Sequence, residues 1–195
     1  QSVDFRIDEN ESVPTITLAT STSTIDENSS STVTLTATSS IVASKDITVT
    51  LATTGTGTNG TDYSALNATT ITISAGATTG TKTFTITDDS VYEGNETVIV
   101  AISSVSGSNA VEYGGNQSVT TTITENESAP TVTLATSATS IAENSSDTIT
   151  LTATASQIAD EDITVTLATT GTATDGTDYS AVNRTTITIS AGATT

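Results

Sequence analysis

The stretch DITVTLATTGTGTNGTDYSA, residues 46–65, decides the fold. Its first half alternates apolar and hydroxyl side chains, with Ile47, Val49 and Leu51 separated by threonines. Because successive side chains of a β-strand point to opposite faces, this alternation predicts a strand with one buried and one exposed face. The stretch returns at residues 162–181 with two substitutions, so the same local structure is expected twice.

The repetition extends over most of the chain. Residues 14–79 align with residues 130–195 at an offset of 116; of the 66 aligned pairs 16 differ, which leaves 50 identities. QSVDFRIDENESV (1–13) matches QSVTTTITENESA (117–129) in the same register. We therefore interpret the chain as part of a tandem array. It would comprise the last strand of a preceding repeat (1–12), a complete repeat (13–128) and the first part of the next repeat (129–195).

The complete repeat contains seven runs with strand-like alternation. Apolar residues occupy every second position, and threonine, of which the chain has 50, suits the solvent face of a pleated sheet. Sheets that each bury one face are typical of a two-layer sandwich. Residues 129–195 hold only four such runs, so we expect that piece to need further sequence or a neighbouring chain to close its core. The seven predicted strands are 14–20, 31–38, 46–54, 69–74, 81–87, 96–103 and 117–124.

Acidic residues dominate the charge of the chain. There are 22 Asp and Glu against 4 Lys and Arg, which gives a net charge of −18. Nucleic acids and anionic membrane surfaces are bound through Lys and Arg, so neither is an expected partner. No run of about 20 apolar residues occurs, so this segment is not expected to insert into a membrane.

The residue types also argue against catalysis. The chain has no His and no Cys, so Ser–His–Asp and Cys–His arrangements are unavailable. A glycosidase would need only two carboxylates, but four Tyr, two Phe and no Trp offer little surface for stacking a sugar. We therefore expect a protein that is not an enzyme.

The acids fall at particular places along the predicted strands. Strands of a sandwich reverse direction at each turn, so the loops after the first, third and fifth runs and the exit of the seventh should share one end. Seven carboxylates lie in those loops, and their mutual repulsion would be strong unless a cation neutralised it. Calcium accepts six to eight oxygen ligands from loops of this kind, whereas zinc would favour His or Cys. The alternative reading is that the acids decorate the loops of an acidic, soluble protein. The candidate calcium ligands are Glu27, Asp62, Asp88, Asp89, Glu93, Glu125 and Glu127.

Four motifs, in order and spacing, resemble the Calx-β domain pattern: ENSSSTVTLTAT (27–38), GTGTNGTDY (55–63), TFTITDDSVYEGNETVIVAI (83–102) and TITENE (122–127). The resemblance covers residues 13–128, the visible part of 129–195 and the strand at 1–12. It implies an all-β chain of immunoglobulin-like seven-stranded β-sandwich modules in tandem. Such domains occur in sodium–calcium exchangers, an integrin β subunit and large bacterial surface proteins.

The resemblance also implies a ligand set for Ca²⁺. In the calcium-binding members of the family, ligands come from the positions that match the seven carboxylates named above. Two positions depart from the family pattern, because Ser90 and Asn126 (Asn10 in the preceding repeat) stand where the most acidic relatives carry acids. We therefore expect fewer ions or weaker binding. The equivalent residues of the other repeats are Glu143 and Asp178 in the third and Glu9 and Glu11 in the first.

Three functions follow from these features. The first is a calcium-binding extender module of a large secreted or cell-surface adhesin, in which Ca²⁺ rigidifies the junctions between repeats and the partners are the adjacent repeats of the same chain. The second is a subunit of a self-assembling surface layer or extracellular filament, with neighbouring copies as partners. Regulatory calcium sensing, as in the exchangers, ranks behind both.

Overall fold

The computed structural model describes residues 12–64, 66, 70–115, 117–180, 182 and 185–195. By its internal contacts the chain divides into two compact units. Unit 1 comprises residues 1–88 and 95–124, and unit 2 comprises residues 89–94 and 125–195. The short segment 89–94 thus belongs with unit 2, although it lies within the complete repeat.

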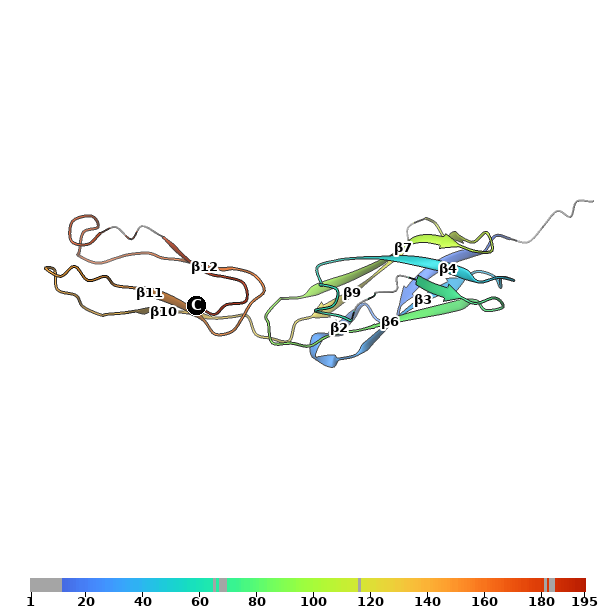
Figure 1. The fold of residues 1–195 in the computed structure, drawn as a ribbon, viewed down its shortest axis with the longest axis horizontal. Helices are drawn as coiled ribbons and strands as arrows, with labels where there is room; N and C mark the ends of the chain where they lie inside the picture. The colour runs from blue at the N-terminus through green and yellow to red at the C-terminus, as the bar shows by residue number, and fades with distance from the viewer. Residues whose placement is uncertain (1–11, 65, 67–69, 116, 181, 183–184) are drawn as a thin grey trace, which may run out of the picture. The chain divides into compact units, whose positions relative to one another are not determined.

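Unit 1 is built from two β-sheets (Figure 1). The first has four strands in the order β6-β3-β1-β8, and the second has five in the order β2-β9-β7-β4-β5. The strands of the first sheet are β1 (Thr15–Thr20), β3 (Thr32–Ser39), β6 (Thr79–Thr85) and β8 (Val111–Glu112). Those of the second are β2 (Thr24–Asp26), β4 (Ile47–Thr54), β5 (Thr70–Ile73), β7 (Glu96–Ser106) and β9 (Ser118–Thr124).

The apolar side chains of the alternating pattern pack into a single core between the two sheets. The apolar residues at the inward-facing alternate positions, among them Ile47, Val49 and Leu51, are buried in the described structure, and Val119 is half-buried and packs against the same core. Thr121, between Val119 and Ile123, is buried as well. Its hydroxyl donates to Thr22 O at 3.1 Å, so this polar group on the inner face is satisfied. The predicted two-sheet sandwich is confirmed.

All seven predicted runs form strands, and two further short strands appear. β2 pairs parallel with β9, and β8 pairs parallel with β1. These strands have three and two residues, too few for an alternating pattern to reveal them. A β-bulge near Ser103 also shifts the register of β7 against β4, and Ser103 Oγ donates to Thr50 O at 3.2 Å.

Unit 2 reproduces half of this architecture. β10 (Val132–Thr136) pairs with β11 (Leu151–Ala155), and β12 (Ile163–Thr166) pairs with β13 (Thr186–Ile189). The registers equal those of β1–β3 and β4–β5 after the offset of 116. Its small core consists of Ala153, Ala155 and Ile189, with partly buried neighbours.

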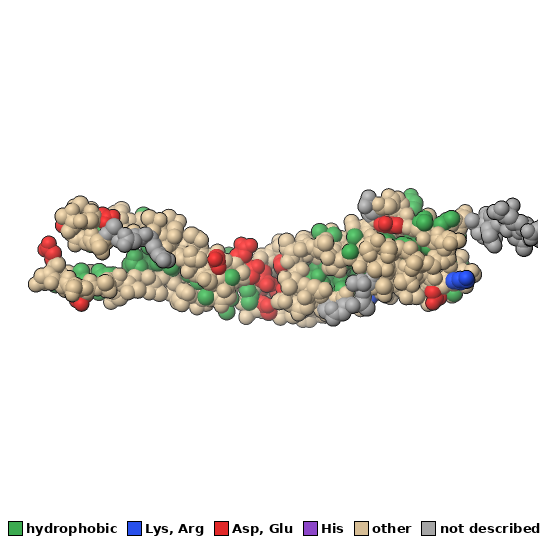
Figure 2. Space-filling model, turned by 45° about the horizontal axis from the view of Figure 1, so that its top comes forward, with side chains coloured by type: hydrophobic (Ala, Val, Ile, Leu, Met, Phe, Trp, Pro, Cys, Tyr) green, Lys and Arg blue, Asp and Glu red, His purple; other side chains and the backbone are tan. Residues whose placement is uncertain are grey.

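Backbone and side chains that are neither charged nor hydrophobic cover much of the visible surface, and hydrophobic side chains show within unit 2 (Figure 2). Within the described residues, no helix is long and apolar enough to cross a membrane. In the part of the chain that the structure describes, the one helical element is a 3-10 turn, η1 (Glu27–Ser29). Its position directly after β2 matters for the site.

Candidate metal-binding site

The connections that carry the acids of unit 1 are tied together at one end of its sheets. In the first sheet β1 and β6 run in the same direction, because each is antiparallel to β3. In the second sheet β4 and β9 run in the same direction, because each is antiparallel to β7. Backbone hydrogen bonds join the segment after β6 to two other connections. Thr87 N donates to Asp62 O, between β4 and β5, at 2.9 Å, and Ile86 N donates to Ser31 O, just before β3, at 3.1 Å.

Glu27 is placed by the short strand β2. Because β2 pairs in parallel with β9, Asp26 lies opposite Thr124, and the Thr124 hydroxyl donates to Asp26 Oδ1 at 2.6 Å. Glu27 then begins the 3-10 turn and is only 4% exposed. A glutamate at this depth is unusual unless it is paired or bound to a cation.

Asp62 lies in the turn between β4 and β5. Its Oδ2 accepts a hydrogen bond from Thr58 N–H, which closes the turn, and the residue is 5% exposed. Its other oxygen, Oδ1, is buried and has no hydrogen-bond partner among the described residues. A buried carboxylate oxygen without a donor is costly, and a bound cation would remove the cost.

Tyr63, the residue next to Asp62, lies close enough to the carboxylates for their charges to affect its pKa. Tyr63 is buried and packs edge-on against Phe84, with ring centroids 5.5 Å apart. Burial raises the pKa of the Tyr63 hydroxyl, and the negative charges of Asp62 and Glu96 raise it further. Glu96 is the first residue of β7 and is half-buried. The sequence pattern does not predict Glu96 as a ligand, because a residue at the start of a strand gives no sign of what its side chain faces.

In unit 2, Glu125 clamps the segment 89–94. Its Oε2 accepts hydrogen bonds from Glu93 N at 2.6 Å and Gly94 N at 2.8 Å, and its Oε1 accepts from Asn126 N and Glu127 N, both at 2.9 Å. Partial burial acts to raise the pKa of Glu125, but these backbone donors and a hydrogen bond with the Glu127 side chain outweigh it and lower the pKa to about 2. Glu125 is therefore a fixed anion at neutral pH.

The remaining predicted ligands differ in exposure. Glu93 and Glu127 are half-buried, while Asp88 and Asp89 are exposed. Asp89 Oδ1 accepts a hydrogen bond from Val91 N at 2.7 Å. Asn126, where the sequence lacks an acid, donates from Nδ2 to Glu127 Oε1 at 3.0 Å and so orients that carboxylate.

The ligand equivalents of the other repeats are less informative. Glu143 and Asp178 are both exposed, although Asp178 Oδ2 accepts from Thr174 N at 2.7 Å and closes the same turn as Asp62 does. Glu9 and Glu11 lie outside the described residues. Burial of the aspartate therefore depends on the complete sandwich around it, whereas the turn forms locally.

The donor set fits a hard divalent cation. All candidate ligands are carboxylates, and the sequence contains no His or Cys that could favour zinc. Among the described residues, carboxylates that could serve as metal ligands are Glu27, Asp62 and Glu96 in unit 1, and Asp89, Glu93, Glu125 and Glu127 in unit 2. The buried Oδ1 of Asp62 is the structural observation that favours a cation over plain solvation.

The chain folds into a two-sheet β-sandwich, in which the carboxylates Glu27 and Asp62 are buried, and a second unit that repeats half of its strands. The Calx-beta domain family model matches residues 8–127 and 125–195, and the chain belongs to this family. The predicted resemblance is thereby confirmed. No curated protein sequence matches the chain.

Three solved structures show what the chain is similar to. A crystal structure of CBD12 from CALX1.2 matches 52% of the chain and 40% of its own length at 18% identity and a TM-score of 0.43. The apo-form Calx CBD1 domain matches 59% of the chain and 99% of its own length, also at 18% identity and a TM-score of 0.43. A chaperone–tip adhesin complex of CFA/I fimbriae biogenesis matches 91% of the chain and 83% of its own length, at 12% identity and a TM-score of 0.36.

Proposed function

We propose that the chain is a calcium-binding extender module of a large secreted or cell-surface adhesin, in which Ca²⁺ stiffens the junction between successive repeats. Glu27, Asp62 and Asp88 would supply ligands from unit 1. Asp89, Glu93, Glu125 and Glu127 would supply them from unit 2. An ion held by both groups would restrict movement of one unit against the other, and its partners would be the adjacent repeats.

The observation that carries this proposal is the buried, unpartnered Oδ1 of Asp62 in a chain with 22 acids and 4 cations. Lys and Arg are too few to neutralise the acids, so a cation from solution is the remaining source of charge. The Calx-beta family membership supports calcium as that cation, as the resemblance implied. Tandem modules that contact only their neighbours build extended arrays, which suits a spacer.

Thermal unfolding of residues 1–195 tests the calcium site. The melting temperature is measured in EDTA, then across a calcium titration, with magnesium as the control ion. A ligand that binds only the folded state adds about 2.7 kcal/mol per site at 100 times its dissociation constant. We expect the melting temperature of the complete module to rise with calcium and much less with magnesium. An unchanged melting temperature at millimolar calcium would refute the site.

Stiffening is tested separately by small-angle X-ray scattering of the same chain. We expect the distribution of overall dimensions to narrow on going from EDTA to saturating calcium. A melting temperature that rises without any narrowing would retain the calcium site and refute the stiffening role.

A second candidate function is assembly into a surface layer or filament. Val132, Leu134, Ile149 and Leu151 of unit 2 are exposed, whereas their counterparts in unit 1 are buried, so this face needs either the later strands of its own repeat or strands from a neighbouring copy. Strands donated by a neighbouring copy would cover such a face. Sizing and mass measurement decide between the two functions, since concentration-dependent oligomers or fibres favour assembly and a monomer at high concentration favours the spacer.

A further inference from the structure

A backbone bridge in unit 2 joins the connection 89–94 to residues 158–160. Tyr92 N donates to Ile158 O at 3.0 Å, and Asp160 N donates to Tyr92 O at 3.2 Å. Tyr92 is thus paired with Ala159 in a one-residue parallel bridge. Because the connection belongs to the complete repeat and Ala159 to the next repeat, this bridge attaches one repeat to its successor. It uses main-chain groups, as in strand addition to a sheet edge.

The receiving segment has a counterpart in unit 1. After the offset of 116, Ala159 corresponds to Ala43. The two alanines have the same local hydrogen bonds: Ala43 O accepts from Gly76 N at 2.9 Å, and Ala159 O accepts from Gly192 N at 2.8 Å. Both alanines are buried. The receiving structure is therefore preserved in both repeats.

In unit 1 the groups that would form the bridge are unused. Among the described residues nothing hydrogen-bonds to Val42 O or Ser44 N, which correspond to Ile158 O and Asp160 N. The Val42 side chain is 60% exposed, whereas its counterpart Ile158 is half-buried. An exposed valine beside unpaired backbone groups indicates a surface that lacks its partner.

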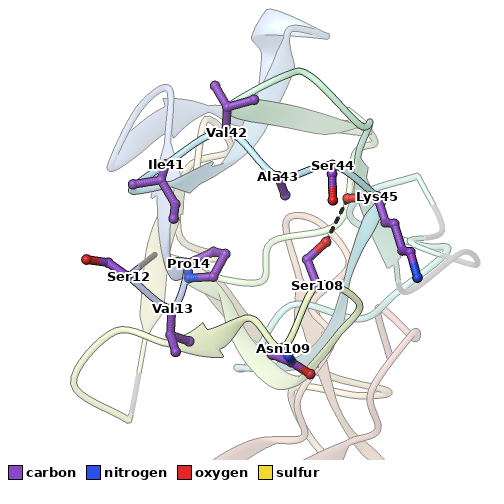
Figure 3. Close-up of a pocket in the computed structure, with 10 residues that line it drawn as sticks. All are labelled: Ser12, Val13, Pro14, Ile41, Val42, Ala43, Ser44, Lys45, Ser108 and Asn109. Carbon is purple, nitrogen blue, oxygen red and sulfur yellow. Dashed lines mark hydrogen bonds between the residues drawn. The ribbon is translucent and has the colours of Figure 1, made fainter. Parts of the chain in front are cut away.

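These groups border an open hollow of about 640 Å³ (Figure 3). The run from Ile41 to Lys45 forms one side of the hollow, the stretch from Ser12 to Pro14 forms another, and Ser108 and Asn109 lie opposite. A second hollow, in unit 2, contains Tyr92, and four of its lining residues occupy the same repeat positions as lining residues of the first. The four are Pro130, Ala159, Asp160 and Glu161, which correspond to Pro14, Ala43, Ser44 and Lys45.

We infer that this hollow receives the Val91–Gly94 connection of another copy of the repeat, placed before this one in the chain. The inference rests on the tandem organisation in the proposed function but not on calcium. Charge favours the contact, because the incoming connection carries Glu93 and the receiving side carries Lys45, where unit 2 has Glu161. Docking at Ala43 therefore needs no cation to offset repulsion between these two side chains.

Cysteine cross-linking tests the contact in an extended chain. Residues 13–116 are placed before Gln1, so that with residues 1–12 they form a complete preceding repeat. Tyr92→Cys is made in the added copy and Ala43→Cys in the original chain, which has no cysteine of its own. The Tyr92→Cys/Ala159→Cys pair in the unextended chain is the positive control, and Thr81→Cys replaces Ala43→Cys in the negative control. Bridge-paired residues lie within the range in which disulfides form.

We expect the Tyr92/Ala43 pair to form a reducible disulfide in EDTA as readily as the Tyr92/Ala159 pair does, and the Thr81 control to form none. Formation only with calcium would still support the contact and would add a requirement for the ion. Cross-linking of the positive control without cross-linking at Ala43, in either condition, would overturn the inference. The calcium titration of the melting temperature tests the proposed function independently of this result.

Hydrogen exchange gives a second readout that requires no substitution. In the extended chain the Ser44 amide should exchange at least about tenfold more slowly than in residues 1–195, because it would donate to the added copy's Tyr92 carbonyl. The Asp160 amide, which has that bond already, should be equally slow in both chains. An unchanged Ser44 rate would overturn the inference even if the cysteine variants failed to fold.

Discussion

At the scale of single residues, Asp62 combines two roles. Its Oδ2 closes a local turn, which Asp178 repeats in the next module, while its Oδ1 is buried without a donor. The first role needs only the side chain. The second lowers the stability of the fold unless a cation binds Oδ1. The two roles can be separated by substitution.

Asp62→Asn should preserve the turn and weaken calcium binding. The amide oxygen still accepts from Thr58 N–H, so the free energy of unfolding in EDTA should change by no more than about 1 kcal/mol. Loss of one anionic ligand should weaken calcium binding by at least about tenfold, which reduces the calcium-induced stabilisation by about 1.4 kcal/mol at a fixed concentration. Both are measured by thermal melts with and without calcium. Asp175→Asn, which neutralises an exposed carboxylate that is not a predicted ligand, is the control, and an equal loss in both variants would contradict the assignment.

Glu125 is expected to hold the connection 89–94 by hydrogen bonds even without metal. Glu125→Ala removes the acceptor of four backbone N–H groups, and each buried donor left unsatisfied costs about 1–3 kcal/mol. Cleavage by chymotrypsin after Tyr92 in EDTA should become at least about tenfold faster. Glu125→Gln, which keeps one acceptor oxygen, should lie between this variant and the original chain.

Asp147→Ala serves as the charge control for that experiment. It removes one exposed negative charge from the same unit and should leave cleavage at Tyr92 unchanged. If it accelerated cleavage as much as Glu125→Ala, electrostatic repulsion rather than the clamp would determine how the connection is held.

At the scale of elements, the alternation of apolar and hydroxyl residues predicted all seven long strands. This works because each strand buries one face, so a period of two is visible in the sequence alone. β2 and β8 escaped prediction because their existence depends on pairing with β9 and β1, about 100 residues away in the chain. The predicted ligands remain a prediction. What the sequence did not indicate was the Glu125 clamp and the half-buried Glu96, since both depend on how loops fold back.

Gly80 in β6 is explained by the close approach of the two sheets. A Cβ at this position would lie 2.3 Å from Thr72 O and 2.8 Å from Ile71 Cγ2 of β5. Gly80→Ala should therefore force the sheets apart and lower the free energy of unfolding by about 1–3 kcal/mol. The neighbouring exposed Thr81 gives the control, since Thr81→Ala should change it by less than about 0.5 kcal/mol. Equal denaturation midpoints for the two variants would contradict the close packing.

At the scale of the whole molecule, nearly identical sequences occupy different environments. β10 and β11 repeat the register of β1 and β3, and Ala153 and Ala155 stay buried in unit 2. Val132, Leu134 and Leu151 are exposed there, whereas their counterparts in unit 1 are buried. The strands that cover them in unit 1 include β7 and β9, and residues 129–195 contain no counterpart of either. Burial is thus a property of the assembled sandwich and cannot be read from a strand by itself.

Leu18 and Leu134 allow this difference to be measured, because they occupy the same position in the two repeats. Leu18 is 7% exposed and Leu134 is 54% exposed. Leu18→Ala should lower the free energy of unfolding of unit 1 by about 2–5 kcal/mol, through lost burial and the cavity left behind. Leu134→Ala should leave the free energy of unfolding of unit 1 unchanged, because Leu134 belongs to unit 2 and little of its apolar surface is buried.

The stability of unit 1 is measured by urea unfolding, followed by the fluorescence of Tyr63, which is buried in that unit. The chain has no Trp, and Tyr92, Tyr113 and Tyr179 are replaced by Phe in every variant, so that Tyr63 is the only fluorescent probe. The midpoint should fall for Leu18→Ala and stay constant for Leu134→Ala. If a second copy covers the face of unit 2 in solution, Leu134→Ala should instead lower the mass measured at high concentration. A fall in the Tyr63 midpoint for Leu134→Ala would mean that the two units do not unfold independently.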